Sequence, residues 1–236
     1  MFAMKLIFHR CDLGISLLSG SEHVFFRRPS EPVTEYHEKL LLTPDDKMCS
    51  QEHAELMENI DHDLATAWRV MRRFCLLINL GAQTQRPMRP EIIHQTMKAV
   101  MYRLLDMGFA AGSLDEAVRN GLLAFSYHIF LQWQDIKLPC HHFRTVYQKC
   151  ILGLKLGVGV SAQLMLWLLM TGAVSVFNVL DEPWLGEYLQ ECFDGCQVKT
   201  WKETQGMLKL FMWIELLDEQ PGKHIFDFLH RNQKWN

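Results

Sequence analysis

The sequence has little of what tight turns, disulfides or structural metal sites require. It has only 14 Gly and 8 Pro in 236 residues, which argues against a β fold with many turns. Its seven cysteines are scattered, and no two are separated by two residues. An odd, scattered set indicates reduced, buried thiols in an intracellular protein rather than a disulfide framework. A secretory signal is also absent, since His9, Arg10 and Asp12 interrupt the short apolar run at Leu6.

The chain lacks the common signatures of enzymes. It has no Gly-rich phosphate loop, no Gly-x-Ser-x-Gly elbow and no His-Glu-x-x-His sequence. The Asp45-Asp46 pair could belong to a small, magnesium-dependent helical enzyme of isoprenoid type, but that chemistry needs a second carboxylate cluster. Because the pair follows Pro44, it also fits a helix start. We therefore expect a protein that is not an enzyme and has no cofactor, with the isoprenoid-type enzyme as the alternative.

The chain has no large excess of charge of either sign, since its formal net charge is only -3. This balance gives no reason to expect nucleic-acid binding by the chain alone. A basic segment at 64–105 lies between acidic segments at 29–63 and 181–227. Arg69, Arg72 and Arg73 in this segment are a candidate basic docking face for a partner. The alternative, which we favour, is a solvated face that pairs with the acidic segments.

What the chain has in abundance is Leu, Met and apolar residues at helical spacing. Apolar residues recur every three or four positions from Gln51 to Leu80, and Ser113 and Thr200 begin capping boxes. We predict an all-α single domain of roughly seven to nine helices. Its parts would be an N-terminal extension, partly irregular, at 1–40 and a helical domain at 41–236. The expected helices after the first are about 91–107, 114–133, 139–154 and 162–179, followed by helices starting near Glu182, Trp201 and Pro221.

One long stretch, Leu156 to Leu180, contains no charged residue. Its length is enough to span a membrane, for which about 20 residues suffice. However, Gly157 and Gly159 weaken its first part, and Asp181 follows it directly without a basic cluster. We therefore expect residues 162–179 to be a buried central helix, and a membrane-anchored protein is the alternative.

The order of several motifs resembles the fungal-specific transcription factor domain, the helical regulatory region of fungal zinc-cluster transcription factors. The similarity spans about Leu40 to Leu229 and rests on the whole ordered set. Its pieces are Phe74 to Asn79, Tyr102 to Leu105, Asn120 to Phe125, Ile129 to Trp133, Trp167 to Ala173, Pro183-Trp184, Trp201 to Glu203, Leu210 to Ile214, and Asp218 to Gly222.

The resemblance implies transcriptional regulation in the nucleus, with protein partners or a homodimer. Full-length members also carry a six-cysteine zinc cluster that contacts DNA. Here the closest cysteine pair, Cys192 and Cys196, is four residues apart, so the resemblance does not extend to that DNA-binding module. The expected role is a regulatory domain that senses a ligand or a partner.

Two groups of residues are candidates for binding. Aromatic and Met side chains at helical spacing could line a pocket for a small hydrophobic ligand, although packed core is the commoner outcome. These candidates are Phe125, Trp133, Trp167, Met170, Phe211 and Trp213. Cys140, His141 and His142 are three potential metal ligands, but adjacent ligands on a helix point in different directions. We expect no metal there, and a small buried pair at Cys192 and Cys196.

Overall fold

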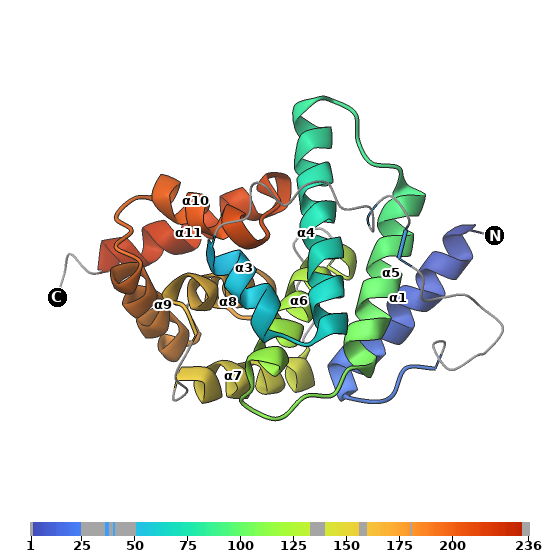
Figure 1. Ribbon diagram of the computed structural model, residues 1–236, viewed down its shortest axis with the longest axis horizontal. Coiled ribbons are helices and arrows are strands. Elements are labelled where there is room, and N and C mark those ends of the chain that lie inside the picture. The colour runs from blue at the N-terminus through green and yellow to red at the C-terminus, as the bar shows by residue number, and fades with distance from the viewer. Residues whose placement is uncertain are drawn as a thin grey trace.

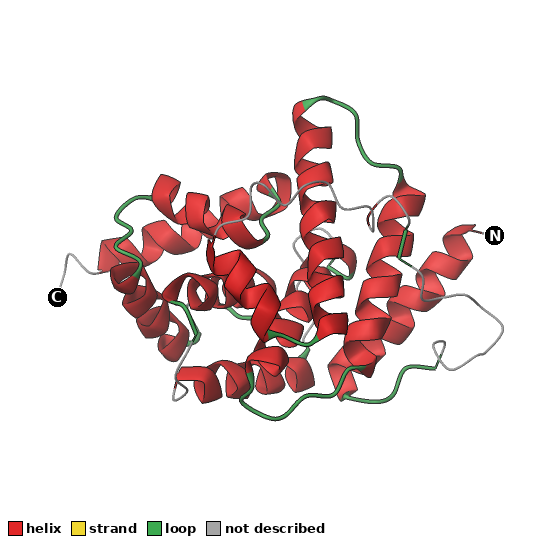
Figure 2. Ribbon diagram, in the orientation of Figure 1, coloured by secondary structure: helices red, strands yellow, loops and turns green. Residues whose placement is uncertain are grey.

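The computed structural model describes residues 2–24, 36–37, 40, 51–132, 140–155, 160–179 and 181–232. These residues form helices and no strands (Figure 2), which confirms the all-α prediction. There are ten helices in this part of the chain, somewhat more than the seven to nine expected. Their bounds are α1 Phe2–Ser19, α3 Gln51–Asn59, α4 His62–Gln83, α5 Pro90–Asp106, α6 Leu114–Phe130, α7 His141–Lys155, α8 Ala162–Ser175, α9 Pro183–Gly195, α10 Trp201–Phe211 and α11 Glu215–Asn232.

α8 is the central helix of the fold. It contacts α6, α7, α9, α10 and α11, which surround it (Figure 1). Every residue from Leu164 to Ser175 is buried. The helix begins at Ser161, whose hydroxyl accepts a hydrogen bond from the Leu164 amide, as an N-cap does. A helix that is apolar all round and enclosed by five others explains the uncharged stretch of the sequence.

α8 ends four residues before the predicted end at 179. The amides of Val176 and Phe177 both donate to the carbonyl of Gly172, which closes the helix at Ser175. The remaining 14-residue helix is shorter than the ~20 residues that a membrane span needs. Within the described ranges, no helix combines the length and the apolar character needed to cross a membrane.

α6 crosses α8 at close range because Gly121 has no side chain. A Cβ atom at Gly121 would lie 2.5 Å from Leu168 Cδ2 and 2.9 Å from Trp167 Cζ3. Separations this short are strongly repulsive, so a larger residue at position 121 would force the side chains of Leu168 and Trp167 to shift. The crossing places the middle of α6 against the central helix.

The helix predicted from Gln51 to Leu80 is two helices. Asp61 interrupts it, because its carboxylate accepts hydrogen bonds from the amides of Asp63 and Leu64 and so caps α4. α4 also runs past Gly81 to Gln83. This division, together with an ordered helix at the N-terminus, accounts for most of the difference in helix number.

α11 begins six residues before the predicted start at Pro221. The carboxylate of Asp218 accepts a hydrogen bond from the Ile214 amide at 2.7 Å, which stabilises a helix start at Glu215. Pro221 therefore lies inside α11 instead of in its first turn. An interior proline costs a helix one backbone hydrogen bond, and here the tertiary contacts of α11 outweigh that cost.

The N-terminal segment contributes to the same core as the rest of the chain. α1 packs on α5 and α7, and the side chains of Leu13 and Leu17 are buried in the main hydrophobic cluster. The segment predicted as an extension therefore supplies a packed helix.

Candidate functional site

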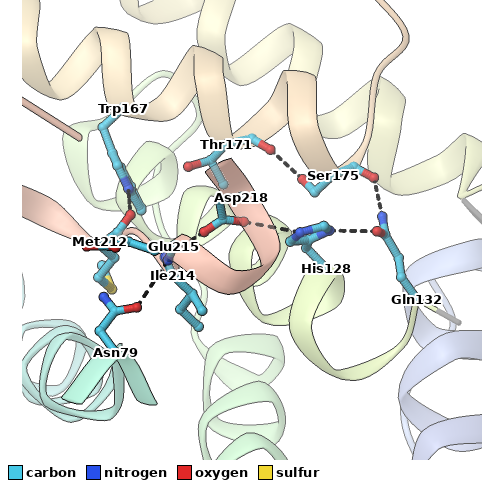
Figure 3. A network of polar contacts seen from close by, with 10 residues as sticks. All are labelled: Asn79, His128, Gln132, Trp167, Thr171, Ser175, Met212, Ile214, Glu215 and Asp218. Atoms are coloured by element: carbon cyan, nitrogen blue, oxygen red, sulfur yellow. Dashed lines mark hydrogen bonds and ion pairs between the residues drawn. The ribbon is translucent and has the colours of Figure 1, made fainter. Parts of the chain in front are cut away.

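The segment between α10 and α11, residues 212–214, is buried without being helical. Side chains from α4, α8 and α11 form hydrogen bonds with backbone groups of this segment, as Figure 3 shows. Trp167 Nε1 donates to the Met212 carbonyl at 2.9 Å, and Asn79 Nδ2 donates to the Trp213 carbonyl at 2.8 Å. Asn79 Oδ1 also accepts from the Glu215 amide at 3.1 Å. Because unpaired buried backbone groups are costly, these bonds fix the entry into α11.

Beside this segment, α6 and α11 are joined by a buried histidine and aspartate. His128 Nε2 lies 3.1 Å from Asp218 Oδ1, and the two side chains are 15% and 3% exposed. His128 Nδ1 contacts Gln132 Oε1 at 2.6 Å, and Gln132 Nε2 donates to the Ser175 carbonyl at 2.6 Å. The chain of contacts in Figure 3 therefore runs from α8 through α6 to α11.

The contacts determine where the protons lie. A carbonyl can only accept, so Gln132 Nε2 must face Ser175 and Gln132 Oε1 must face His128. His128 Nδ1 therefore carries a proton. His128 Nε2 and Asp218 Oδ1, 3.1 Å apart, make the contact between α6 and α11 in a largely buried position.

A cavity of about 510 Å³ adjoins this pair and is here called the His128 cavity. Its volume falls within the range of about 300–1,000 Å³ typical of small-molecule sites. α6 supplies His128, and Gln132 follows just after the end of α6, while α8, the segment after it and α11 supply mostly apolar residues. The lining comprises His128, Gln132, Ala173, Val174, Phe177, Asn178, Val179, Leu216, Leu217, Gln220, Pro221, His224, Ile225 and Phe228. This arrangement suits a compact apolar molecule with few polar groups.

Cys75 of α4 is a thiol close enough to Asp218 for the two groups to interact electrostatically. Burial raises the pKa of Cys75 well above its usual range, and the negative charge of Asp218 raises it further. The thiol is therefore protonated at neutral pH and is a weak nucleophile.

The predicted pocket residues are placed in the core. Phe125, Trp167, Met170, Phe211 and Trp213 are all buried, at 3% exposure or less. Trp133 lies outside the described residues. The Trp167 ring centroid lies 5.0 Å from that of Trp68, 6.2 Å from Phe211 and 6.5 Å from Phe125. Phe125, Trp167 and Phe211 thus belong to one aromatic cluster, whereas the Trp213 ring lies 6.1 Å from that of Trp201. None of the described candidates lines the His128 cavity.

The three arginines of the predicted basic face differ in their surroundings. Arg69 is exposed, whereas Arg72 and Arg73 are partly buried. Arg72 lines a groove of about 400 Å³ together with Phe211, Met212 and Trp213. The basic side of α4 therefore adjoins the buried segment that leads into α11.

The candidate metal ligands Cys140, His141 and His142 differ in their exposure to solvent. Cys140 is buried, whereas His141 and His142 are exposed. Burial raises the pKa of Cys140, and a contact with Tyr127 opposes this change. Cys192 is buried, and Cys196 is partly buried. The described ranges contain no group of three or more His, Cys, Asp or Glu placed to hold a metal, and the Asp45-Asp46 pair lies outside those ranges.

The residues that join α6 to α11 were not predicted from the sequence. His128 and Gln132 are four residues apart on a largely apolar helix, and this spacing places both on one face. Asp218 follows Ile214 by four residues, a spacing that could indicate a side chain turned back to the helix start. Neither signal identifies the other half of the pair, which lies 90 residues away in the chain.

The described residues form an all-α protein with a mostly apolar cavity between the end of α6, the end of α8 and α11. No family model, curated protein or solved structure matches the chain.

Proposed function

We propose that the chain is the regulatory domain of a fungal zinc-cluster-type transcription factor. In this proposal it acts in the nucleus by sensing a small hydrophobic ligand or a protein partner, and it carries out no catalysis. DNA contact would come from a separate module, and the domain would control that module through partners or a homodimer. The proposal begins from the sequence resemblance and is supported by the packing of the residues that carry it.

The observation that carries the proposal is that these motifs contact one another in space. Trp167 donates a hydrogen bond to Met212. A Cβ atom at Gly222 would lie 2.7 Å from the Trp213 ring and 2.8 Å from the Trp201 ring. Motifs that are far apart in the sequence thus form one packed unit around α8. This mutual packing supports the view that the order of the motifs reflects a common fold and not chance.

The mechanism we propose is a shift between two packings of α11. A molecule in the His128 cavity would touch α6, α8 and α11 together, so it would favour the packing in which all three line the cavity. Leu216 and Leu217, in the first turn of α11, are 76% and 40% exposed. A movement of α11 would change the position of this apolar pair, which a partner could recognise.

A reporter assay tests the proposal. The chain is placed between a zinc-cluster DNA-binding module and an acidic activation segment, and reporter output in yeast is compared with that of a flexible linker of equal length. We expect the chain to change output by about 10-fold, which corresponds to about 1.4 kcal/mol. Reporter output is measured under several growth conditions. Leu217→Trp, which would fill the cavity, should make the output the same under all of them. Leu152→Trp, at a site 38% exposed on α7, is the matched control. Output equal to that of the flexible linker under all conditions would contradict the proposal.

A further inference from the structure

The outer face of α1 is apolar and exposed to solvent. α1 packs on α5 and α7 and lies at the edge of the molecule (Figure 1). From residue 7 to residue 18 its exposed residues are Ile7, Phe8, Cys11 and Ile15, here called the α1 stripe. Ile7, Phe8 and Ile15 are 59%, 52% and 56% exposed. Because a surface helix normally presents polar residues to water, an apolar stripe of this kind indicates a surface that another molecule covers.

The charged side chains in the same part of α1 are turned toward the rest of the fold. Asp12 is buried and accepts hydrogen bonds from the Tyr102 hydroxyl at 2.8 Å and from the Val24 amide at 2.9 Å. The guanidinium carbon of Arg10 lies 5.4 Å from the centre of the Phe130 ring. Covering the α1 stripe would therefore desolvate no charged side chain of the stripe itself, and desolvated charge is the main cost of burying a helix surface.

The spacing of the stripe is symmetric about Cys11. Ile7 and Ile15 lie four residues before it and four residues after it, and residues four apart share one face of a helix. If two copies of α1 cross in antiparallel directions at Cys11, Ile7 and Phe8 of each copy lie opposite Ile15 of the other. A two-fold interface has this property, because one patch serves both copies. Cys11, the smallest side chain of the stripe, then lies at the axis, where the two helices approach most closely.

The size of the stripe fits a weak dimer. Three apolar side chains that are more than half exposed leave roughly 300 Å² of apolar surface in water, a size at which a patch on a monomer is often functional. Two stripes with their margins would bury on the order of 1,000 Å², which is the lower limit for a specific interface. The association should therefore depend on concentration within the range that solution methods reach.

We propose that the α1 stripe binds the same stripe of a second copy of this chain, with the two helices antiparallel and Cys11 of each copy at the two-fold axis. The proposed function allows a homodimer without assigning its surface. α1 also lies outside the span from Leu40 to Leu229 that carries the sequence resemblance. The interface therefore does not rest on the regulatory proposal, and a failure of either would leave the other standing.

Sedimentation equilibrium of the full chain, in reducing buffer from about 10 μM to about 1 mM, tests the interface. We expect a monomer–dimer equilibrium, and Ile15→Arg should weaken it at least about 10-fold because it buries a charge. Leu80→Arg is the matched control, since Leu80 of α4 is 53% exposed against 56% for Ile15, and it should dimerise as the parent does. A monomer at every concentration, or equal dimerisation of Ile15→Arg and the parent, would overturn the proposal.

The same variants distinguish a second copy from a lipid surface. The parent chain is mixed with phosphatidylcholine vesicles and centrifuged, and we expect it to stay in the supernatant. A monomeric chain that pellets with the vesicles, and stays in the supernatant when it carries Ile15→Arg, would overturn the proposal in favour of a lipid surface.

Cross-linking tests the antiparallel register. A short bismaleimide joins thiols that lie close together, so it should yield a covalent dimer of the parent chain, in which Cys11 is exposed. Cys11→Ser should lose most of that product and sediment as the parent does. Two further variants each combine Cys11→Ser with one new thiol, by Ile7→Cys or by Ile15→Cys. Their mixture should cross-link more than either variant alone, and more product from each variant alone would overturn the antiparallel arrangement.

Discussion

α6 and α8 cross at Gly121, and both are buried along most of their length. α8 carries no charged residue, and its Ser175 hydroxyl turns back to the Thr171 carbonyl one turn earlier. α6 instead carries polar groups that extend away from it, with His128 reaching α11 and Arg119 reaching the end of α5.

The two helices thus have different roles: α8 contributes packing, and α6 contributes polar side chains. α8 holds the fold together by enclosure, and neither charge nor a titratable group on it is available to a ligand. α6 carries residues, among them His128 and Arg119, that line two cavities of about 510 and 360 Å³. We infer that recognition depends on α6, while stability depends first on α8. The following predictions test that division, beginning with the largest effect.

Trp167→Ala tests the packing role of α8. The variant removes a fully buried indole and the hydrogen bond to Met212, so the free energy of unfolding should fall by about 5 kcal/mol. Urea unfolding followed by circular dichroism measures the loss. Trp167→Phe keeps most of the ring and should lose only about 1–2 kcal/mol. Similar losses in the two variants would show that the ring itself contributes little.

Asp218→Ala tests the link between α6 and α11. It leaves His128 and the Ile214 amide without their buried acceptor, and removal of one member of a buried pair costs about 3–5 kcal/mol. Hydrogen exchange should quicken first in 214–232. Asp218→Asn keeps an oxygen near the Ile214 amide and should cost less. An Asp218→Ala variant as stable as the parent would show that the His128–Asp218 contact does not hold α11 in place.

Gly121→Ala tests the close crossing of the two helices. The added Cβ would meet Leu168 Cδ2 at 2.5 Å, and such overpacking costs about 1–3 kcal/mol. Gly206 of α10 has open space around its Cβ position, so Gly206→Ala is the matched control and should stabilise the protein by about 0.5–1 kcal/mol. The difference in thermal midpoint between the two variants measures how strongly a Cβ atom at position 121 destabilises the helix crossing. Equal midpoints would contradict a close crossing at Gly121.

The smallest expected effect is a pH dependence at the end of α6. His94 stacks on Phe130 with ring centroids 5.5 Å apart. Burial lowers the pKa of His94 to about 4, and the positive charges of His9, Lys98 and Arg10 act in the same direction. The unfolded chain therefore binds this proton more readily. The contribution of the neutral ring is complete above pH ~6.5 and is lost as the pH falls toward 4.

His94→Phe should remove this part of the pH dependence, on the order of 1 kcal/mol once solvent screening is allowed for. Urea unfolding at several pH values between 4 and 7 measures it. His62→Gln is the control, because the His62 side chain is 89% exposed. Equal pH dependence in the parent chain and in His94→Phe would show that the ring titrates alike in the folded and unfolded states.

The sequence predicts those parts of the fold that depend on local signals. The capping box at Thr200 and the N-cap at Ser161 are both formed, because each needs only residues within one helical turn. The buried helix was predicted because its apolar residues cover every face. The predicted end of α8 and the predicted start of α11 were wrong. α8 ends where the amides of Val176 and Phe177 bond to the Gly172 carbonyl, and α11 starts where Asp218 bonds to the Ile214 amide, and neither bond is evident from the sequence.

The candidate site was not predicted for a related reason. His128 and Asp218 have an ordinary appearance in the sequence, and they become a pair only when α6 and α11 meet. Conversely, the described candidates for a ligand pocket, Phe125, Trp167, Met170, Phe211 and Trp213, are buried in the core. Apolar periodicity identifies what is buried, whereas a cavity depends on how well distant surfaces fit together.

The central claim is that a ligand in the His128 cavity shifts the packing of α11. Hydrogen exchange of the full chain, with and without an apolar small-molecule extract of fungal cells, tests it most directly. We predict slower exchange with the extract in 212–232, no such change in Leu217→Trp, and a normal response in Leu152→Trp. Identical protection of every helix with and without the extract would contradict ligand sensing at this site.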